Sequence, residues 1–474
     1  MNKKKPRILM VVLCFLPESV GGSEFYTYHL SQELMKQGYD VTVLASLRDM
    51  TLESYKVITT VFEGLKVIKI VNSPMAVRAF ADHFMDARVD EIFREVLREE
   101  KPDLVHFQHI AYLSGRMPEI AKEMNVPSVA TFHDYWYICF RSQLIRPGCG
   151  VCPGPSGGVY CASCNDVSAT NPTAVPKYPL INRFFQLPLI RRFDLKKNLS
   201  PKVIQKIRLA LYRQPAGNGG QTADLEDPHV KENIFRFEFF KRQFLFPEFV
   251  LSPSLHLKKR YEAVGYREIL QVPLGFYKAE KVERLPFEGK LKIAYLGNIV
   301  PFKGAGVILK ELLKVRNRDM VEAHFYGRPS NEWYFEEVKK LAREFSEGIV
   351  TFHGGYRSDK ELKEILSQVH LVVFPSLWEE NYPLVVREAL LHGLPVIGSK
   401  LGGVPEAIED GVNGFLFDPY QEGNLAEKLD LVLNNPKILE QITDGARNTK
   451  IESMDDHMDK MINIYNEAIK KASP

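Results

Sequence analysis

Two glutamates with seven residues between them, Glu380 and Glu388, are the side chains whose spacing most clearly suggests a binding chemistry. Residues 371–375 form a short apolar run ending in proline, which is typical of a buried parallel strand. Tyr382-Pro383 is then expected to open a helix, with Glu380 in the preceding loop and Glu388 one to two turns inside. The amides and dipole of that helix start suit an anion such as a diphosphate. The two carboxylates are therefore better suited to accept hydrogen bonds from hydroxyl groups, such as those of a ribose and a hexose.

A lysine that follows an earlier strand can complete this anion site. Residues 295–304 read as the end of a strand, a glycine at Gly297 that lets the backbone approach a ligand, and Lys303 just before a helix. Taken alone, the stretch is explained equally well as an ordinary strand-to-helix turn with a solvated lysine. Combined with the two glutamates in the same half of the chain, it favours a functional role.

Strands that alternate with helices must position these residues. Alternation of this kind indicates βαβ units and parallel, doubly wound sheets, in which ligands bind beyond the carboxyl ends of the strands. We therefore predict an α/β fold of two Rossmann-like domains that face each other across a cleft. The strands expected in the first half are 8–15, 40–45, 67–71, 103–107, 128–133 and a core strand within 248–254. Those in the second half are 291–296, 322–326, 349–353, 371–374 and 395–397.

The alternation also predicts the domain boundaries. Residues 1–275 are expected to form the first domain, interrupted at about 139–247 by a cysteine cluster and a basic helical insertion. Residues 276–455 are expected to form the second domain. A helix over 456–474 is expected to pack back on the first domain.

Composition limits the class of protein. With 474 residues, 45% of them hydrophobic, the chain can form at least two cores. A net charge of +3 gives no support for nucleic-acid binding over the whole surface. The apolar run 8–16 is too short to span a membrane, and no longer run suggests a transmembrane helix. We expect a cytoplasmic protein, with peripheral attachment to the inner face of the membrane as an additional possibility.

The motifs of the second half resemble those of glycosyltransferase family 4, the retaining enzymes of the GT-B fold. The resemblance rests on Gly-x-x-x-Pro-x-Lys-Gly at 297–304, Pro-Ser-x-x-Glu-Glu at 375–380, the Glu-x7-Glu spacing, and the stretch 402–414. In the first half, Gly-Gly-Ser-Glu at 21–24 and Thr-Phe-His-Asp at 131–134 add to it. The likeness extends over nearly the whole chain except 166–247, and it suggests a bacterial polysaccharide or envelope-type member carrying a four-cysteine insertion.

The resemblance implies roles for individual residues. Glu388 would hold the ribose hydroxyls, Glu380 the hydroxyls of the donor sugar, and Lys303 the departing diphosphate. His133 would lie near the donor sugar and the acceptor. The family usually has an arginine where this chain has Asn298, and Arg387 is one candidate to replace it. The donor-binding positions implied besides Glu388 are Gly297, Asn298, Asn381, Tyr382, Leu384, Val385, Tyr356, Gly21 and Gly22.

The implied activity is a hexosyl transfer with retention of configuration. The donor would be a UDP- or GDP-sugar, and the acceptor a glycan or a lipid-linked molecule of polysaccharide or cell-envelope biosynthesis. A lysine and a helix start would stabilise the leaving group, so no metal cofactor is expected for catalysis. A front-face route assisted by the leaving phosphate is implied, with a covalent route through Glu380 as the alternative. Two other functions stay open: a catalytically weak nucleotide-sugar-binding partner subunit and a nucleotide-sugar epimerase.

Four cysteines between the two halves have the spacing of a structural zinc site. Cys149-x-x-Cys152 and Cys161-x-x-Cys164 could supply four thiolates, and the glycines around them suit tight turns. Free or disulfide-bonded thiols are the alternative, although a reducing cytosol disfavours disulfides. Cys14 and Cys139 are expected to be small core residues.

Residues 177–213 carry ten lysines and arginines and one acid, interleaved with apolar residues. A basic amphipathic segment of this kind can lie on an anionic membrane surface. It can equally pack its apolar face on the domain and leave its charges in water.

Overall fold

The computed structural model describes residues 5–49, 51–72, 80–146, 150–162, 164, 225–356 and 358–472. It divides into two compact units. The first comprises Met1–Ser252, Arg260–Leu270 and Met458–Pro474, and the second comprises Pro253–Lys259 and Gln271–His457.

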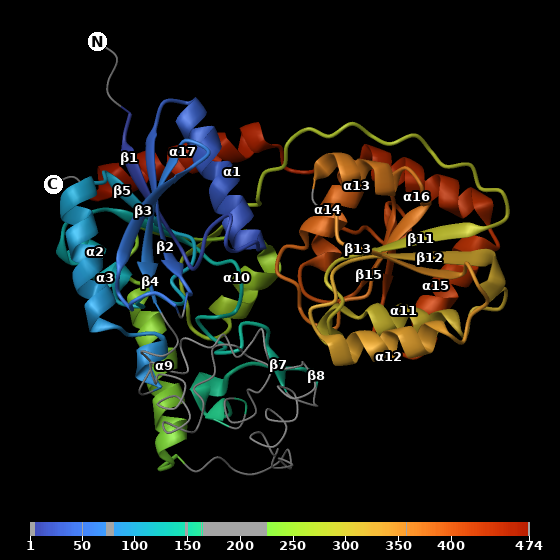
Figure 1. Cartoon of the computed structure of the whole chain (residues 1–474), viewed down its shortest axis with the longest axis horizontal. Coiled ribbons are helices and arrows are strands. Elements are labelled where there is room, and N and C mark those ends of the chain that lie inside the picture. The colour runs from blue at the N-terminus through green and yellow to red at the C-terminus, as the bar shows by residue number, and fades with distance from the viewer. Residues whose placement is uncertain are drawn as a thin grey trace. The chain divides into compact units, whose positions relative to one another are not determined.

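The first unit is built on an eight-stranded sheet with strand order β10-β9-β6-β5-β1-β2-β4-β3 (Figure 1). The neighbours from β9 to β4 pair in parallel, and β3 is antiparallel to its partner β4. The elements of this part of the chain are β1 (Arg7–Val12), α1 (Gly22–Lys36), β2 (Asp40–Leu47), β3 (Val57–Phe62), β4 (Leu65–Val71), η2 (Ala81–His83), α2 (Ala87–Glu100), β5 (Leu104–Phe107), α3 (Met117–Glu123), β6 (Ser128–Thr131), β7 (Ile145–Arg146), β8 (Gly150–Val151), η3 (Ser156–Gly158), α9 (Pro228–Gln243), β9 (Phe249–Ser252), α10 (Leu255–Glu262) and β10 (Ile269–Gln271).

The second unit has a fully parallel six-stranded sheet of order β13-β12-β11-β14-β15-β16. Numbered within the unit, this is the doubly wound order 3-2-1-4-5-6, whose direction reverses between β11 and β14. Its elements are β11 (Leu291–Leu296), η5 (Pro301–Lys303), α11 (Ala305–Leu312), η6 (Arg318–Met320), β12 (Val321–Tyr326), α12 (Glu332–Ala342), β13 (Val350–Gly354), α13 (Asp359–Leu366), β14 (Leu371–Phe374), α14 (Leu384–Leu391), β15 (Val396–Ser399), η7 (Val404–Glu406), β16 (Gly414–Phe417), α15 (Asn424–Leu433), α16 (Pro436–Asn448) and the first residues of α17 (Met454–Ala472).

Two cores cover the two faces of the second sheet. Because successive strand residues point to opposite faces, Ile293 and Tyr295 of β11 enter one core, while Ala294 and Leu296 enter the other. The first core includes residues of α11, α12 and α15, and the second includes residues of α13 and α14. Figure 1 shows these helices on either side of the strands. Burial on both faces explains why the strands read as continuous apolar runs.

The last helix contributes to the first unit. From Met458 onward, α17 belongs to that unit, and the hydroxyl of its buried Tyr465 lies 2.7 Å from Nδ1 of His106 on β5.

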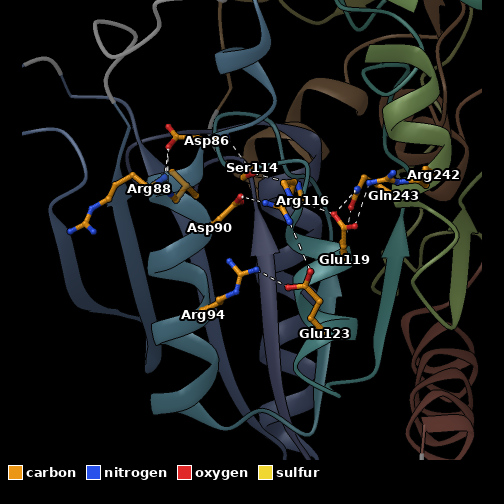
Figure 2. A network of polar contacts seen from close by, with 11 residues as sticks. Asp86, Arg88, Asp90, Arg94, Ser114, Arg116, Glu119, Glu123, Arg242 and Gln243 are labelled. Carbon is orange, nitrogen blue, oxygen red and sulfur yellow. Dashed lines mark hydrogen bonds and ion pairs between the residues drawn. The ribbon is translucent and has the colours of Figure 1, made fainter. Parts of the chain in front are cut away.

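A polar network ties α9 to the helices beside the first sheet (Figure 2). Arg116 lies 3.4 Å from Asp90 of α2 and 3.3 Å from Glu119 of α3. Glu119 in turn accepts from Gln243, the last residue of α9, and from Arg242. Asp90 is buried, and burial raises the pKa of its carboxyl, so this arginine offsets a real desolvation cost. The network fixes the carboxyl-terminal end of α9.

The α/β prediction with two parallel sheets is confirmed. The predicted strand over 8–15 ends earlier, at Val12. Among the described residues, five strands were not expected from the sequence: β3, β7, β8, β10 and β16.

Gly304 offers a direct test of how the second sheet is assembled. Its φ is +75°, and an added Cβ would lie 1.9 Å from the carbonyl oxygen of Pro375. Gly304→Ala should therefore cost about 3 kcal/mol or more of unfolding free energy, from backbone strain and a clash with the end of β14. Denaturant unfolding of the purified variant measures this.

The matched control is Gly348→Ala. Gly348 has a similar φ of +86° but no atom within 4 Å of an added Cβ. The Gly348→Ala variant should lose only about 1 kcal/mol of unfolding free energy, because its backbone is strained but its new Cβ meets no other atom. Equal losses in the two variants would contradict the proposed close approach.

Candidate active site at the carboxyl edge of the second sheet

The loops that follow β11 and β14 carry the charged residues singled out in the sequence. These adjacent strands lie where the strand order reverses, which is where ligands bind in open α/β sheets. Lys303 ends η5 after β11, and Glu380 lies in the loop after β14. Leu377 donates a backbone hydrogen bond to the carbonyl of Phe302, so the two loops are joined next to these residues.

Lys303 and Glu380 form an ion pair. Nζ of Lys303 lies 2.6 Å from Oε1 of Glu380, and the glutamate is only 6% exposed. The same oxygen accepts from the indole of Trp378 at 2.7 Å and from the hydroxyl of Ser376 at 3.0 Å. The lysine also lies 5.5 Å from the centroid of the Trp378 ring. Sequence reasoning missed Ser376 and Trp378 as partners, although both lie inside the Pro-Ser-x-x-Glu motif.

Two glycines hold the loop that carries Glu380. The amide of Gly403 donates to the carbonyl of Glu380 at 2.6 Å. A Cβ on Gly402 would lie 2.3 Å from that carbonyl oxygen, and one on Gly403 would lie 2.1 Å from the carbonyl oxygen of Asn381. Asn381 is buried, and its side-chain oxygen accepts a hydrogen bond from the hydroxyl of Ser254 at 2.7 Å. Backbone packing therefore holds the loop of Glu380 in place without the help of a ligand.

The helix after this loop, α14, begins at Leu384 with Pro383 as its N-cap. The first amides of the helix, including those of Leu384 and Val385, have no carbonyl one turn earlier to bond, so they point out at the helix start. Tyr382 donates to the carbonyl of Leu274 at 3.2 Å. Arg387 stacks 3.5 Å from the centroid of the Tyr382 ring and donates to the carbonyl of Pro383, so its guanidinium supports the loop.

Glu388 has a different environment from Glu380. It lies one turn into α14 as predicted, and its carboxylate has no hydrogen-bond partner among the described residues. Burial raises the pKa of Glu388 to about 7, and the negative charge of Asp359 acts in the same direction. Tyr356 is near enough for the charge of Glu388 to raise the pKa of its phenol, after the larger effect of burial.

The turn after β11 brings two loops together. Gly297 has a φ of +145°, and a Cβ on Gly327 would lie 1.8 Å from the carbonyl oxygen of Gly297. The carbonyl of Asn298 accepts from the hydroxyl of Tyr295 at 2.8 Å. Ile299 donates to the carbonyl of Arg328, an exposed cation in the loop after β12. Arg328 thus places a positive charge on the loop next to Asn298, which sequence reasoning did not anticipate.

The remaining predicted residues belong to the first unit. Gly21 is the N-cap of α1 and Gly22 its first residue, and a Cβ on Gly21 would lie 2.6 Å from Oε2 of Glu24. His133 follows β6 and donates from Nε2 to the side-chain oxygen of Gln108 at 2.7 Å. Burial lowers the pKa of His133 to about 3, and the Coulombic effect of the neighbouring His109 acts in the same direction. Its imidazole is therefore neutral near pH 7.

The cysteine and basic segments are only partly described. Cys149 and the whole of 177–213 lie outside the described residues, so the structure does not test the four-cysteine set or the membrane-binding helix as predicted. Cys152 and Cys161 form no disulfide within the described part of the chain. Within the part of the chain that is described, no helix is long and apolar enough to cross a membrane.

Two family profiles match this chain. The one described as "Glycosyl transferases group 1" matches residues 277–449, which include Lys303, Glu380 and Glu388. The one described as "Glycosyltransferase Family 4" matches residues 20–149, and together the two cover more than half of the chain. The chain belongs to glycosyltransferase family 4. The family resemblance read from the motifs is confirmed, while Cys152, Cys161 and Cys164 lie outside both matches.

Similar proteins of known function match parts of this family 4 chain. An MMP alpha-(1->4)-mannosyltransferase of Mycolicibacterium hassiacum is 26% identical over 219 residues, 44% of this chain and 51% of that protein. A D-inositol 3-phosphate glycosyltransferase of Mycolicibacterium smegmatis is 32% identical over 161 residues, 33% of this chain and 35% of that protein. The chain thus spans about half or less of the length of these curated relatives.

Solved structures match over nearly the full length. A sucrose-phosphate synthase from Thermosynechococcus elongatus has a TM-score of 0.62 at 16% identity, with 99% of this chain and 100% of the other covered. The Anabaena protein HepE, solved in complex with UDP, has a TM-score of 0.61 at 15% identity, with 97% and 100% covered. At such identities the likeness shows the fold alone, and that fold is GT-B.

The environment of Glu388 predicts a pH-dependent stability. Because its pKa is raised from 4.5 to about 7, the folded chain holds a proton that the unfolded chain releases, and stability falls as pH rises through this range. Glu388→Gln removes the effect, so it should gain on the order of 3 kcal/mol over the parent chain between pH 4.5 and pH 8. Urea unfolding at the two pH values measures the difference. The exposed Glu337→Gln on α12 is the control and should show no such gain; a gain of similar size there would contradict the assignment.

Proposed function

We propose that this chain is a retaining hexosyltransferase that uses a UDP- or GDP-sugar and needs no metal ion for catalysis. The acceptor would be a hydroxyl group of a glycan or of a lipid-linked glycan in polysaccharide or envelope biosynthesis. The observation that carries the proposal is the Lys303–Glu380 ion pair at the switch point of the second sheet, next to the start of α14. Relatives named as a mannosyltransferase and as a D-inositol 3-phosphate glycosyltransferase support glycosyl transfer.

The ion pair suggests how donor binding proceeds. The side chain of Lys303 is 28% exposed while that of Glu380 is 8% exposed, so the ammonium is the partner that a ligand can reach from solvent. A diphosphate bound at the start of α14 would compete for this ammonium through two negative charges. As Lys303 shifts toward the phosphates, Oε1 of Glu380 gains capacity to accept from a sugar hydroxyl. Ser376 and Trp378 still hold the carboxylate in place during this exchange.

The leaving group would then be stabilised by charge. As the bond between the anomeric carbon and the phosphate oxygen breaks, negative charge grows on the diphosphate. Lys303 and the amides of Leu384 and Val385 supply the compensating positive charge, and such a preorganised donor is worth several kcal/mol. Retention follows if the acceptor hydroxyl attacks from the face that the diphosphate leaves and gives its proton to a phosphate oxygen.

Lys303→Ala should therefore reduce turnover far more than it reduces donor affinity. Loss of one such donor costs about 10²- to 10³-fold in kcat. The measurement is release of UDP or GDP from a panel of nucleotide sugars, with and without EDTA. Lys310→Ala removes an exposed lysine from α11 of the same unit and should leave turnover unchanged. Full activity of the Lys303 variant would refute the proposal.

The same panel separates the two alternative functions. A binding partner without catalysis would hold nucleotide sugars but release no nucleotide, with or without Glu380→Ala. An epimerase would convert the nucleotide sugar itself when no acceptor is present. Chromatography of the products without added acceptor distinguishes epimerisation from transfer or slow hydrolysis.

Donor affinity should depend on the ionisation of Glu388. A carboxylate accepts from both ribose hydroxyls, whereas the protonated acid must lose its proton first. Because its pKa is about 7, affinity for UDP or GDP should rise about tenfold from pH 6 to pH 8. Calorimetric titration measures this, and Glu388→Gln controls for titration of the nucleotide phosphate itself. The same pH slope in both proteins would show that Glu388 does not bind the ribose.

A further inference from the structure

Four cysteines line one small cavity in the segment after β6. Cys139, Cys152, Cys161 and Cys164 surround a space of about 20 Å³ together with Arg141 and Tyr160. A cavity of this size holds one water molecule or one ion. Cys139 was expected to be a plain core residue, and its place in this lining is new.

The backbone brings the thiols to this cavity. The amide of Cys152 donates to the carbonyl of Leu144, which links the chain just after Cys139 to the glycine-rich loop. The amide of Cys161 donates to the carbonyl of Gly158, and the amide of Cys164 donates to the carbonyl of Cys161, each at 3.0 Å, as in a tight turn. Arg260 donates to the carbonyl of Cys152 at 3.3 Å. The cavity wall is thus assembled from three separate stretches of chain.

A buried cation lies against the same cluster. Arg236 of α9 is 3% exposed, and its guanidinium lies over the rings of Trp136 and Phe240 at 5.0 and 4.9 Å. It donates to the carbonyl of Trp136, while its Nε has no hydrogen-bond partner among the described residues. The acidic groups that act on its charge are the thiols of Cys139 and Cys161 and the phenols of Tyr266 and Tyr261, and no carboxylate of the described residues forms an ion pair with it.

Such a charge is costly unless an anion compensates it. Without a carboxylate, this buried guanidinium loses its hydration and gains in return one carbonyl acceptor and aromatic contacts. The contact between α9 and the cysteine loop is intimate, because a Cβ on Gly158 would lie 2.5 Å from the carbonyl oxygen of Asn233. The fold therefore holds a positive charge beside a set of groups that can become negative.

We propose that Cys139, Cys152, Cys161 and Cys164 form a tetrathiolate site for Zn²⁺, with Arg236 as its buried counter-charge. The proposal replaces Cys149 by Cys139 and does not depend on the proposed transferase function. On binding, four thiols release four protons, and the zinc-tetrathiolate centre carries two negative charges. Arg236 offsets one of them. Four sulfur ligands leave no open position, so the metal would be structural.

Metal binding has to draw the sulfurs together. Among the described residues, no three potential ligands are grouped closely enough to hold a metal ion as they stand. The loop has room for such a movement, because no atom lies within 4 Å of a Cβ added to Gly154 or Gly157. Structural zinc sites commonly complete their geometry as the metal binds.

Paired cysteine variants of the full chain test the ligand set. Zinc is measured by elemental analysis of the purified protein and by release to a chelator, and Co²⁺ substitution reports the ligands through its thiolate charge-transfer and ligand-field bands. The parent chain and Cys149→Ser should hold one equivalent of zinc with the spectrum of four sulfurs. Cys139→Ser should release zinc at least tenfold more readily. Cys139→His should keep the metal but shift the Co²⁺ bands, which tests the site even if the serine variant folds poorly.

Three outcomes would overturn the ligand set: a parent chain without zinc after growth in zinc-supplemented medium, zinc loss in Cys149→Ser with retention in Cys139→Ser, or identical spectra for Cys139→His and the parent. Arg236→Met tests the counter-charge, because it keeps the apolar bulk without the cation. It should weaken zinc retention about tenfold, while Arg236→Lys should restore most of it. Equal retention by the methionine and lysine variants would show that the charge has no part in the site.

Discussion

The second unit is organised around one contact between opposite charges. Glu380 is nearly inaccessible, and a buried carboxylate without partners would cost several kcal/mol. Lys303, Ser376 and Trp378 all converge on its Oε1, so this cost is met by three hydrogen bonds to a single oxygen. Three glycines around the loop, Gly304, Gly402 and Gly403, help to hold this ion pair in place, because they allow close backbone contacts that any side chain would block. The pair therefore constrains both the loop sequence and the neighbouring strand ends.

The carboxylates of Glu380, in the loop after β14, and Glu388, in the helix that follows, thus have opposite environments. Glu380 has a cation and two further donors, whereas Glu388 has no polar partner among the described residues and a pKa raised to about 7. Separated environments of this kind give chemically similar groups distinct roles. Glu380 is held as a fixed acceptor, and Glu388 is a group whose charge costs energy until a ligand donates to it. Ribose hydroxyls are donors of the required kind, so under the proposed function nucleotide binding and ionisation of Glu388 would be two parts of one event.

The sequence predicted most of this fold because its central strands are buried on both faces and read as unbroken apolar runs, as at 291–296 and 371–374. It missed β3, whose residues alternate between exposed and half-buried and which pairs antiparallel with β4 through the turn at Glu63 and Gly64. The partnership of Lys303 with Glu380 could not follow from spacing, because it depends on β11 and β14 being neighbours in the sheet. Cys139 was missed for a related reason: it lies outside any Cys-x-x-Cys pair, and only the folded chain returns it to Cys152 and Cys161.

The cysteine cluster and the residue predicted to face the sugar share a stretch of chain. His133 ends the extended run that begins at β6, and Cys139 follows it by six residues. That stretch is already fixed by Tyr261, which donates to the carbonyl of Asp134 at 2.8 Å, and by Arg236, which donates to the carbonyl of Trp136. A metal bound to Cys139 would fix the carboxyl-terminal end of this stretch as well. The neutral imidazole of His133 would then be held on one side by its hydrogen bond to Gln108 and on the other by the zinc-bound loop. A structural metal could in this way fix the position of the His133 side chain without contacting it.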